Sequence, residues 1–111
     1  MLTILVPTKN RPDFLIRLLS YYYINNFKHT ILIGDSSSKD LFIKANKQLQ
    51  KFKKKINILH FHYPDHSNYS VTQLLIKKVK SPYVSWLPDD DFFVISSLEK
   101  MVSFLENNKN Y

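Results

Sequence analysis

Three consecutive carboxylates, Asp89, Asp90 and Asp91, form the most chemically suggestive run in this sequence. They follow Pro88 and an apolar segment, residues 83–87, that is typical of a buried strand. Adjacent carboxylates repel one another unless a cation neutralises them, and carboxylate oxygens suit hard ions such as Mg²⁺ and Mn²⁺. The run therefore predicts a metal-phosphate site at the end of a strand. The alternative is a solvated loop that also caps the following helix.

Other polar residues also follow predicted strands. Pro7 and Thr8 come directly after the apolar run 2–6, and Asp35 comes after residues 30–34. Asp35 could accept hydrogen bonds from a base or a ribose, although an Asx-turn or helix cap is the favoured local interpretation. Arg11 either reaches a phosphate or lies on a helix surface.

Three histidines, His60, His62 and His66, raise the question of a metal site. A zinc site needs about three protein ligands in suitable geometry. His66 lies beyond Pro64, away from the strand face that His60 and His62 share. Packing or surface roles are therefore the favoured interpretation of these side chains.

Composition excludes several classes of site. The chain has one glycine, Gly34, so it contains neither a Walker loop nor a dinucleotide-binding fingerprint. It has no cysteine, which excludes disulfides and thiolate zinc sites. If a diphosphate binds, a metal ion must hold much of its charge, and this raises the value of the acidic run.

Apolar periodicity predicts alternating strands and helices. Strands are expected at residues 2–6, 30–34, 56–61 and 82–87, and helices around residues 12–22, 41–52, 70–79 and 96–105. Asn10 and Asp13 have capping spacing around Pro12, and Ser96 and Glu99 resemble a capping box. The alternation predicts an α/β fold with three α/β/α layers and a mostly parallel, Rossmann-like sheet. The polar residues after the strands then meet at one edge of the sheet, where ligands bind.

The net charge of +7 favours anionic partners. The lysines concentrate in residues 44–55 and 77–80, which are typical of solvated helix faces, so a role in solubility is favoured over a nucleic-acid groove. No apolar run approaches the roughly 20 residues that span a bilayer. The first residues lack the pattern of a secretory signal, so the cytoplasm is the expected compartment.

Three blocks of the sequence resemble the N-terminal half of a family 2 glycosyltransferase with the GT-A fold. They are TILVPTKNRP at residues 3–12, IGDSS at residues 33–37 and YVSWLPDDDF at residues 83–92. Their order and spacing are those of the family, and the resemblance runs through essentially all 111 residues. The last block is especially similar to a bacterial subgroup of these enzymes.

The resemblance implies a nucleotide-diphosphosugar donor, Mn²⁺ or Mg²⁺, and transfer of the sugar to an acceptor in bacterial surface polysaccharide or glycoconjugate synthesis. Asp90 matches the central metal-binding acid, Asp35 matches the acid that contacts the base, and Asp89 and Asp91 flank the metal position. The residues expected to bind the donor are Pro7, Thr8, Arg11, Asp35, Asp89 and Asp90, and those expected to bind the metal are Asp90 and Asp91.

The resemblance also bears on domain organisation. Residues 1–111 are expected to form one nucleotide-sugar-binding domain that is incomplete at its C-terminus, because the family's acceptor half and its general base lie further on. A non-catalytic interaction module, or a truncated remnant that keeps the fold, is the alternative. An exposed edge strand favours a homo-oligomer or a partner chain. Peripheral contact with the inner face of the membrane is a further alternative, and nucleic acid is the disfavoured partner.

Overall fold

The chain alternates strands and helices along its length. The computed structural model describes residues 1–110. Its elements are β1 (Leu2–Thr8), α1 (Pro12–Ile24), β2 (Thr30–Asp35), α2 (Lys39–Leu49), the 3₁₀ helix η1 (Gln50–Lys54), β3 (Asn57–His62), α3 (Asn68–Ile76), β4 (Tyr83–Trp86) and α4 (Ile95–Asn107). None of the helices within residues 1–110 is both long and apolar enough to cross a membrane.

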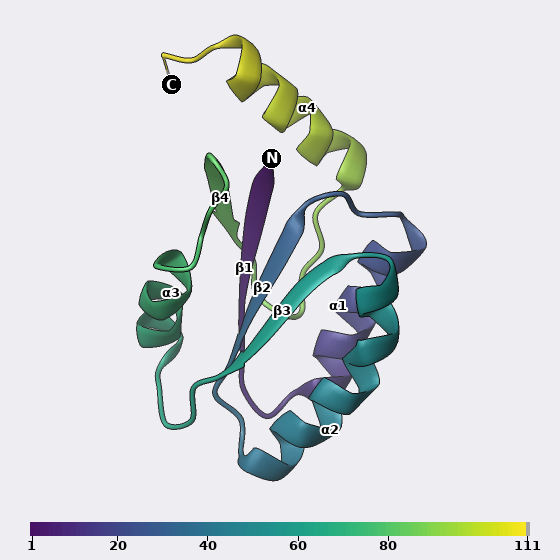
Figure 1. Ribbon diagram of the computed structural model, residues 1–111, viewed down its shortest axis with the longest axis vertical. Helices are drawn as coiled ribbons and strands as arrows, with labels where there is room; N and C mark the ends of the chain where they lie inside the picture. Colours follow the sequence, from purple (N-terminus) through teal and green to yellow (C-terminus); the bar gives the residue numbers. More distant parts are fainter. Residues whose placement is uncertain (111) are drawn as a thin grey trace.

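The four strands form one parallel sheet in the order β3-β2-β1-β4. Helices α1 and α2 cover one face of this sheet, and α3 covers the other (Figure 1). This arrangement confirms the predicted α/β fold with a parallel sheet between layers of helices. Because all the strands are parallel, their C-terminal ends lie at the same edge.

Two apolar cores fill the space between the layers. Successive side chains of a strand point to opposite faces. Ile4 and Val6 accordingly join the core under α1, whereas Leu5 joins a smaller core under α3. All seven residues of β1 are buried. A strand that is covered on both faces reads as a continuous apolar run, which is why β1 was recognisable in the sequence.

The prediction that residues 83–87 form a buried strand is wrong for β4. Val84 and Trp86 are each 49% exposed. The reason is position in the sheet, because β4 pairs only with β1 and lies at the edge. Leu87, just beyond the strand, is buried.

Two predicted helix caps are also wrong. Helix α1 has Pro12 in its first turn, as expected, but Arg11 is the N-cap residue. Asn10 instead ties two loops together, because its backbone N–H donates to Ser37 Oγ and its side-chain oxygen accepts from the Ser38 N–H.

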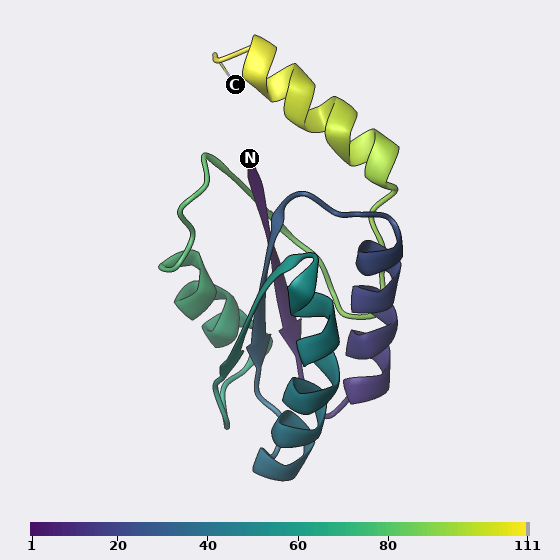
Figure 2. The ribbon, with the colours of Figure 1, turned by 45° about the vertical axis from the view of Figure 1, so that its right-hand side comes forward.

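Helix α4 begins at Ile95, so Ser96 lies within its first turn and no side chain caps it. Glu99 does not complete a capping box and instead contacts His29 Nε2 at 2.9 Å. Two views show α4 at the end of the molecule where β1 begins (Figures 1 and 2). Helix α4 therefore lies away from the edge where the strands end.

Candidate functional site

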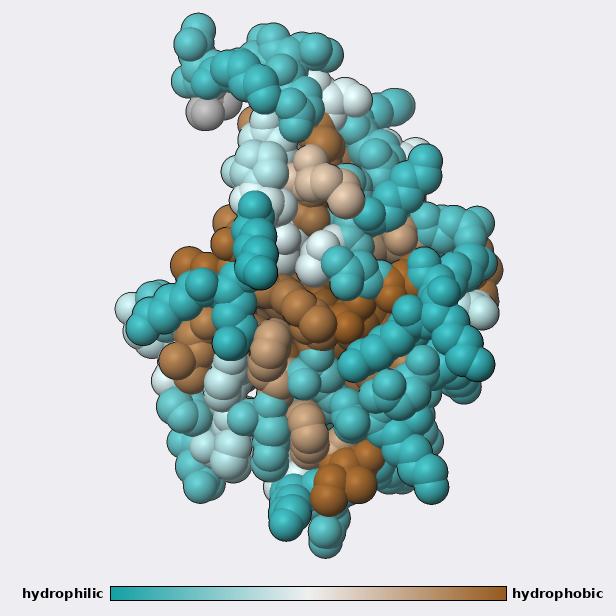
Figure 3. Space-filling view, in the orientation of Figure 1, coloured by the Kyte–Doolittle hydropathy of each residue, from teal (hydrophilic) through white to brown (hydrophobic). Residues whose placement is uncertain are grey.

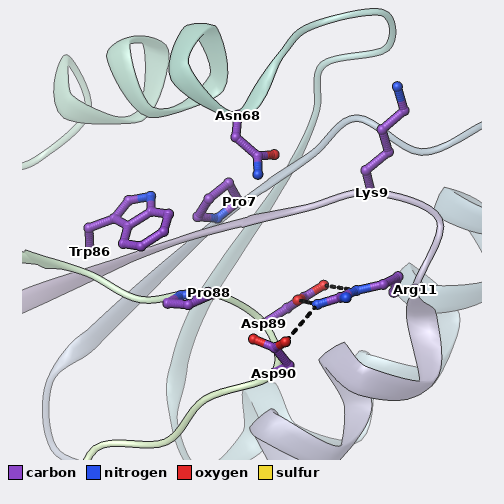
Figure 4. Close-up of a pocket in the computed structure, with 8 residues that line it drawn as sticks. All are labelled: Pro7, Lys9, Arg11, Asn68, Trp86, Pro88, Asp89 and Asp90. Carbon is purple, nitrogen blue, oxygen red and sulfur yellow. Dashed lines mark hydrogen bonds and ion pairs between the residues drawn. The ribbon is translucent and has the colours of Figure 1, made fainter.

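The strand order creates a crevice between β1 and β4. From β1 the sheet continues to β2 on one side and to β4 on the other, so the connections diverge at this point. In open α/β sheets, ligands bind at such a switch point, beyond the C-terminal ends of the strands. A cavity of about 370 Å³ lies there (Figure 4). It is lined by Pro7, Lys9, Arg11, Asn68, Trp86, Pro88, Asp89 and Asp90.

Asp89 anchors the acidic run to the start of the chain. The residue is only 4% exposed. The Thr8 hydroxyl donates to Asp89 Oδ2 at 2.6 Å, and the Arg11 guanidinium contacts both carboxylate oxygens. The Thr8 hydroxyl therefore binds Asp89, and Thr8 is not among the residues that line the cavity. The structure brings these three predicted site residues together across 78 to 81 positions of sequence.

Arg11 supplies part of the positive charge that the acidic run needs. Besides Asp89, the guanidinium lies 3.5 Å from Asp90 Oδ2. The hydrogen bond with Asp89, and the attraction of both carboxylates, raise the pKa of the guanidinium above its ordinary value. The repulsion between Asp89 and Asp90 is therefore relieved in part by a cation of the protein itself.

Asp90 is the carboxylate best placed to hold a metal ion. Its side chain is half exposed and lines the cavity, whereas Asp89 is buried against Arg11 (Figure 4). Asp91 is exposed, adjoins the cavity in sequence and does not line it. Within residues 1–110, no three His, Asp or Glu side chains form a closed metal cage. Mg²⁺ usually binds one or two carboxylates together with substrate phosphates, so this donor set fits an ion that binds along with a diphosphate.

Asp35 lies outside the cavity, in a hydrogen-bonded network of its own. It is 1% exposed. Its Oδ1 accepts the Ser37 N–H at 3.0 Å, and its Oδ2 lies 2.8 Å from His60 Nε2. The bond from the Ser37 N–H is the hydrogen bond of an Asx-turn, as the favoured local interpretation of Asp35 predicted. A contact between Asp35 and a base remains a prediction, and it would require this network to open.

The histidines of β3 pack against α2. The rings of His60 and His62 both lie 4.3 Å from the ring of Phe42, measured between centroids. His60 also contacts Asn46 Oδ1 through Nδ1, and His62 Nε2 contacts the backbone oxygen of Ser37. These contacts confirm the packing interpretation of the two side chains, which share one face of the strand.

The Asp35 network makes a testable contribution to stability. Burial alone would raise the pKa of the Asp35 carboxyl, but hydrogen bonds from His60 and Ser37 outweigh burial and hold the pKa below its ordinary value of 3.8. A lowered pKa stabilises the fold above the unfolded-state pKa, and this contribution is lost as the pH falls through the folded-state pKa. We expect Asp35→Asn to lower the free energy of unfolding at neutral pH, with a difference from wild type that shrinks below about pH 4.

Urea unfolding of both proteins between about pH 7 and pH 2 measures that difference. Asp40→Asn is the matched control, because Asp40 is an exposed carboxylate on α2. A wild-type-to-variant difference that stays constant across the range would contradict the assigned role of the Asp35 carboxylate.

Sequence reasoning missed two residues of the cavity wall, Asn68 and Trp86. The Asn68 amide points into the cavity from the start of α3 (Figure 4). Trp86 lines the cavity together with Pro88 and Asp90, two and four positions further on. Trp86 is the last residue of β4, at the edge where the strands end, so the predicted strand and its edge could have identified it. Asn68 carried no comparable signal, because its place depends on how α3 packs against the sheet.

Comparisons with known proteins agree with this geometry. The family model described as Glycosyl transferase family 2 matches residues 3–111. An uncharacterized glycosyltransferase of Rickettsia bellii is 29% identical over 109 residues, covering 96% of this chain and 15% of that protein. One of Rickettsia felis is 27% identical over 107 residues, covering 96% and 17%. The chain thus spans about a sixth of the length of these curated relatives.

Solved structures share the fold. The crystal structure of S. aureus TarS 1-349 superposes with a TM-score of 0.80 at 16% identity, covering 97% of this chain and 33% of that one. At this identity the likeness concerns the fold alone. The four-stranded parallel sheet and its flanking helices therefore have a counterpart in a larger protein.

Proposed function

Because the chain belongs to glycosyl transferase family 2, we propose that it binds a nucleotide-diphosphosugar together with Mg²⁺ or Mn²⁺ in the cavity between β1 and β4. The observation that carries this proposal is the placement of Asp90. It presents a half-exposed carboxylate to a cavity whose wall also holds Lys9 and Arg11. A carboxylate beside a guanidinium, in a cavity whose wall also includes a lysine, suits a ligand that combines a hard metal ion with phosphates.

Each part of the cavity wall has its own task in this proposal. Asp90 holds the cation, and Asp91 is its neighbour in the acidic run. Lys9 and Arg11 attract the diphosphate by charge. Pro7, Trp86 and Pro88 form an apolar wall on the other side. Such a wall limits the water around the phosphates and strengthens the interactions of the charged groups.

When bound, the metal ion would neutralise the charge that develops on the departing nucleoside diphosphate. The buried Asp89 supports this chemistry without binding the ion. It holds Arg11 beside Asp90, and through Thr8 it fixes the end of β1 against the loop that follows β4. The contact with Arg11 orients the two charged groups that face the ligand, and the contact with Thr8 stabilises the fold at this edge.

A bacterial surface polysaccharide or glycoconjugate is the proposed acceptor class, supported by the resemblance to bacterial enzymes and by the bacterial relatives. No residue of this chain is assigned as the general base.

Nucleotide binding tests the proposal directly. We expect titration calorimetry with UDP, GDP and CDP to detect binding of at least one nucleotide, and only when Mn²⁺ or Mg²⁺ is present. Asp90→Asn keeps the size of the side chain and removes the charge, so it should weaken the metal-dependent binding by about tenfold or more.

Asp40→Asn removes a carboxylate from the exposed surface of α2 and should leave nucleotide binding unchanged. The absence of metal-dependent heat for all three nucleotides would refute donor binding. Metal-dependent binding that is equally strong in Asp90→Asn would refute only the role of Asp90.

A further inference from the structure

A second charged surface lies on α2 and η1, away from the cavity. We call it the basic stripe, and it consists of six exposed lysines: Lys44, Lys47, Lys51, Lys53, Lys54 and Lys55. Lys44, Lys47, Lys51 and Lys54 are spaced three, four and three residues apart, which aligns them along one face of a helix. In the space-filling view, hydrophilic side chains cover much of the region of α2, and a hydrophobic patch lies at its lower end (Figure 3).

The positive charge of the basic stripe is not neutralised by the protein. Residues 41–64 contain six lysines and no Asp or Glu. Among residues 1–110, the ion pairs of the structure involve the N-terminus, Arg11, His29, His60 and Lys109, and none involves a lysine of the stripe. The surface therefore carries a local excess of positive charge that attracts anions.

Aromatic contacts join the end of the basic stripe to the end of α1. The Lys55 ammonium lies 4.7 Å from the centroid of the Tyr23 ring, and the Lys51 ammonium lies 5.2 Å from that of Phe52. The two rings contact each other edge to face at 5.4 Å. Ile24, the next residue after Tyr23 and the last of α1, is 72% exposed. An exposed apolar side chain thus lies one residue from the ring that contacts Lys55.

From these observations we propose that the basic stripe and Ile24 form a docking surface for an anionic lipid membrane. Lysines attract anionic headgroups, while an exposed aliphatic side chain can enter the region between headgroups and acyl chains. A single-stranded nucleic acid would instead need exposed aromatic faces for base stacking. Here Phe52 is buried and Tyr23 is partly covered by Lys55, so the surface suits a membrane better.

The geometry leaves the cavity free in the docked state. Helix α2 starts after the C-terminal end of β2, and η1 leads into the start of β3. The lysine-rich end of the stripe therefore lies at the edge where the strands begin, opposite the edge that carries the cavity (Figure 1). Docking would hold the chain at the membrane with the proposed donor site open to the solvent.

Vesicle binding by the 111-residue chain tests this proposal. We expect sedimentation with vesicles of phosphatidylcholine and phosphatidylglycerol in equal parts, and little with phosphatidylcholine alone. Each lysine near an anionic surface contributes about a factor of five to binding, so Lys53→Glu, Lys54→Glu and Lys55→Glu combined should weaken it by about a hundredfold or more. Ile24→Ser should weaken vesicle binding several-fold and leave binding to single-stranded RNA unchanged.

A charge-matched control separates the surface from the net charge. Lys77, Lys78 and Lys80 are also exposed, and their combined replacement by Glu changes the net charge equally, from +7 to +1. This control should keep most of the vesicle affinity, and circular dichroism verifies that each variant is folded. Equal loss in both triple variants, equal binding to both vesicle types, or tighter binding to RNA than to anionic vesicles at the same salt would overturn the proposal.

Discussion

Replacing Gly34 with alanine is expected to lower the free energy of unfolding by about 3 kcal/mol. A Cβ atom at this position would lie 2.2 Å from Val71 Cγ1 and 3.0 Å from Leu75 Cδ1. Both atoms belong to α3, which packs on this face of the sheet. Alanine is otherwise better than glycine inside a strand by about 0.5–1 kcal/mol, so this gain opposes the clash and does not cancel it. The only glycine of the chain is therefore required by packing.

A compensating substitution tests this explanation. Val71→Ala removes the atom that would clash, and on its own it should cost about 2 kcal/mol, as large-to-small core changes do. Combined with Gly34→Ala, it should cost at least about 1 kcal/mol less than the sum of the two single changes. Urea unfolding at neutral pH measures all four proteins.

Ile56→Val is the control partner for Gly34→Ala, because Ile56 is buried in the core on the other face of the sheet. Its effect should add to that of Gly34→Ala without coupling. Additive costs for Gly34→Ala and Val71→Ala would show that the close approach of α3 is not what excludes a side chain from position 34.

Periodicity predicted most of the fold because the inner strands and the main helices are one-sided or fully buried. The runs that became β1 and β2 are continuous apolar segments, as expected for strands covered on both faces. The same pattern failed to reveal that β4 is an edge strand. Val84 and Trp86 are as apolar as inner-strand residues, and their exposure depends on which strands pair. Strand order is a long-range property that local periodicity does not contain.

Helix starts were predicted less well, for a related reason. Asn10 has the side chain and the position of an N-cap, but the loop before α2 competes for its hydrogen bonds. Ser96 and Glu99 have capping-box spacing, but His29 binds Glu99 from a different part of the chain. In both cases a partner distant in sequence replaced the local one.

The sequence predicted which residues would lie near one another better than it predicted the contacts that each of them makes. Pro7, Arg11, Asp89 and Asp90 meet at one cavity because parallel strands end at one edge. The division of tasks within the acidic run was not visible in the sequence. Asp89 and Asp90 have identical side chains, and only the positions of Thr8 and Arg11 make one buried and leave the other facing the cavity.

Asp89→Ala is expected to impair both the fold and the proposed donor site. The variant would leave the buried Thr8 hydroxyl without its carboxylate, which costs about 2 kcal/mol. It would also free Arg11 to pair fully with Asp90, from which it is now 3.5 Å away. A neutralised Asp90 holds a divalent ion less well, so metal-dependent nucleotide binding should fall by about tenfold, although Asp89 is not assigned as a metal ligand.

Two partner variants separate these effects. Thr8→Val removes the hydroxyl and keeps Arg11 on Asp89, so it should reduce stability and leave nucleotide binding within about twofold of wild type. Arg11→Gln in the Asp89→Ala background removes the cation that would neutralise Asp90.

That double variant should recover part of the metal-dependent binding without recovering stability, since the Thr8 hydroxyl stays unpaired. Chemical denaturation measures the first property, and calorimetry with nucleotide and Mn²⁺ measures the second. Recovery is expected because a guanidinium released from Asp89 neutralises Asp90 more than it attracts the diphosphate. If Arg11→Gln lowers binding further in the Asp89→Ala background, the attraction of the guanidinium for the diphosphate is the larger effect. Asp89 would then not act by positioning Arg11, while the cavity and its acidic wall would keep their proposed roles.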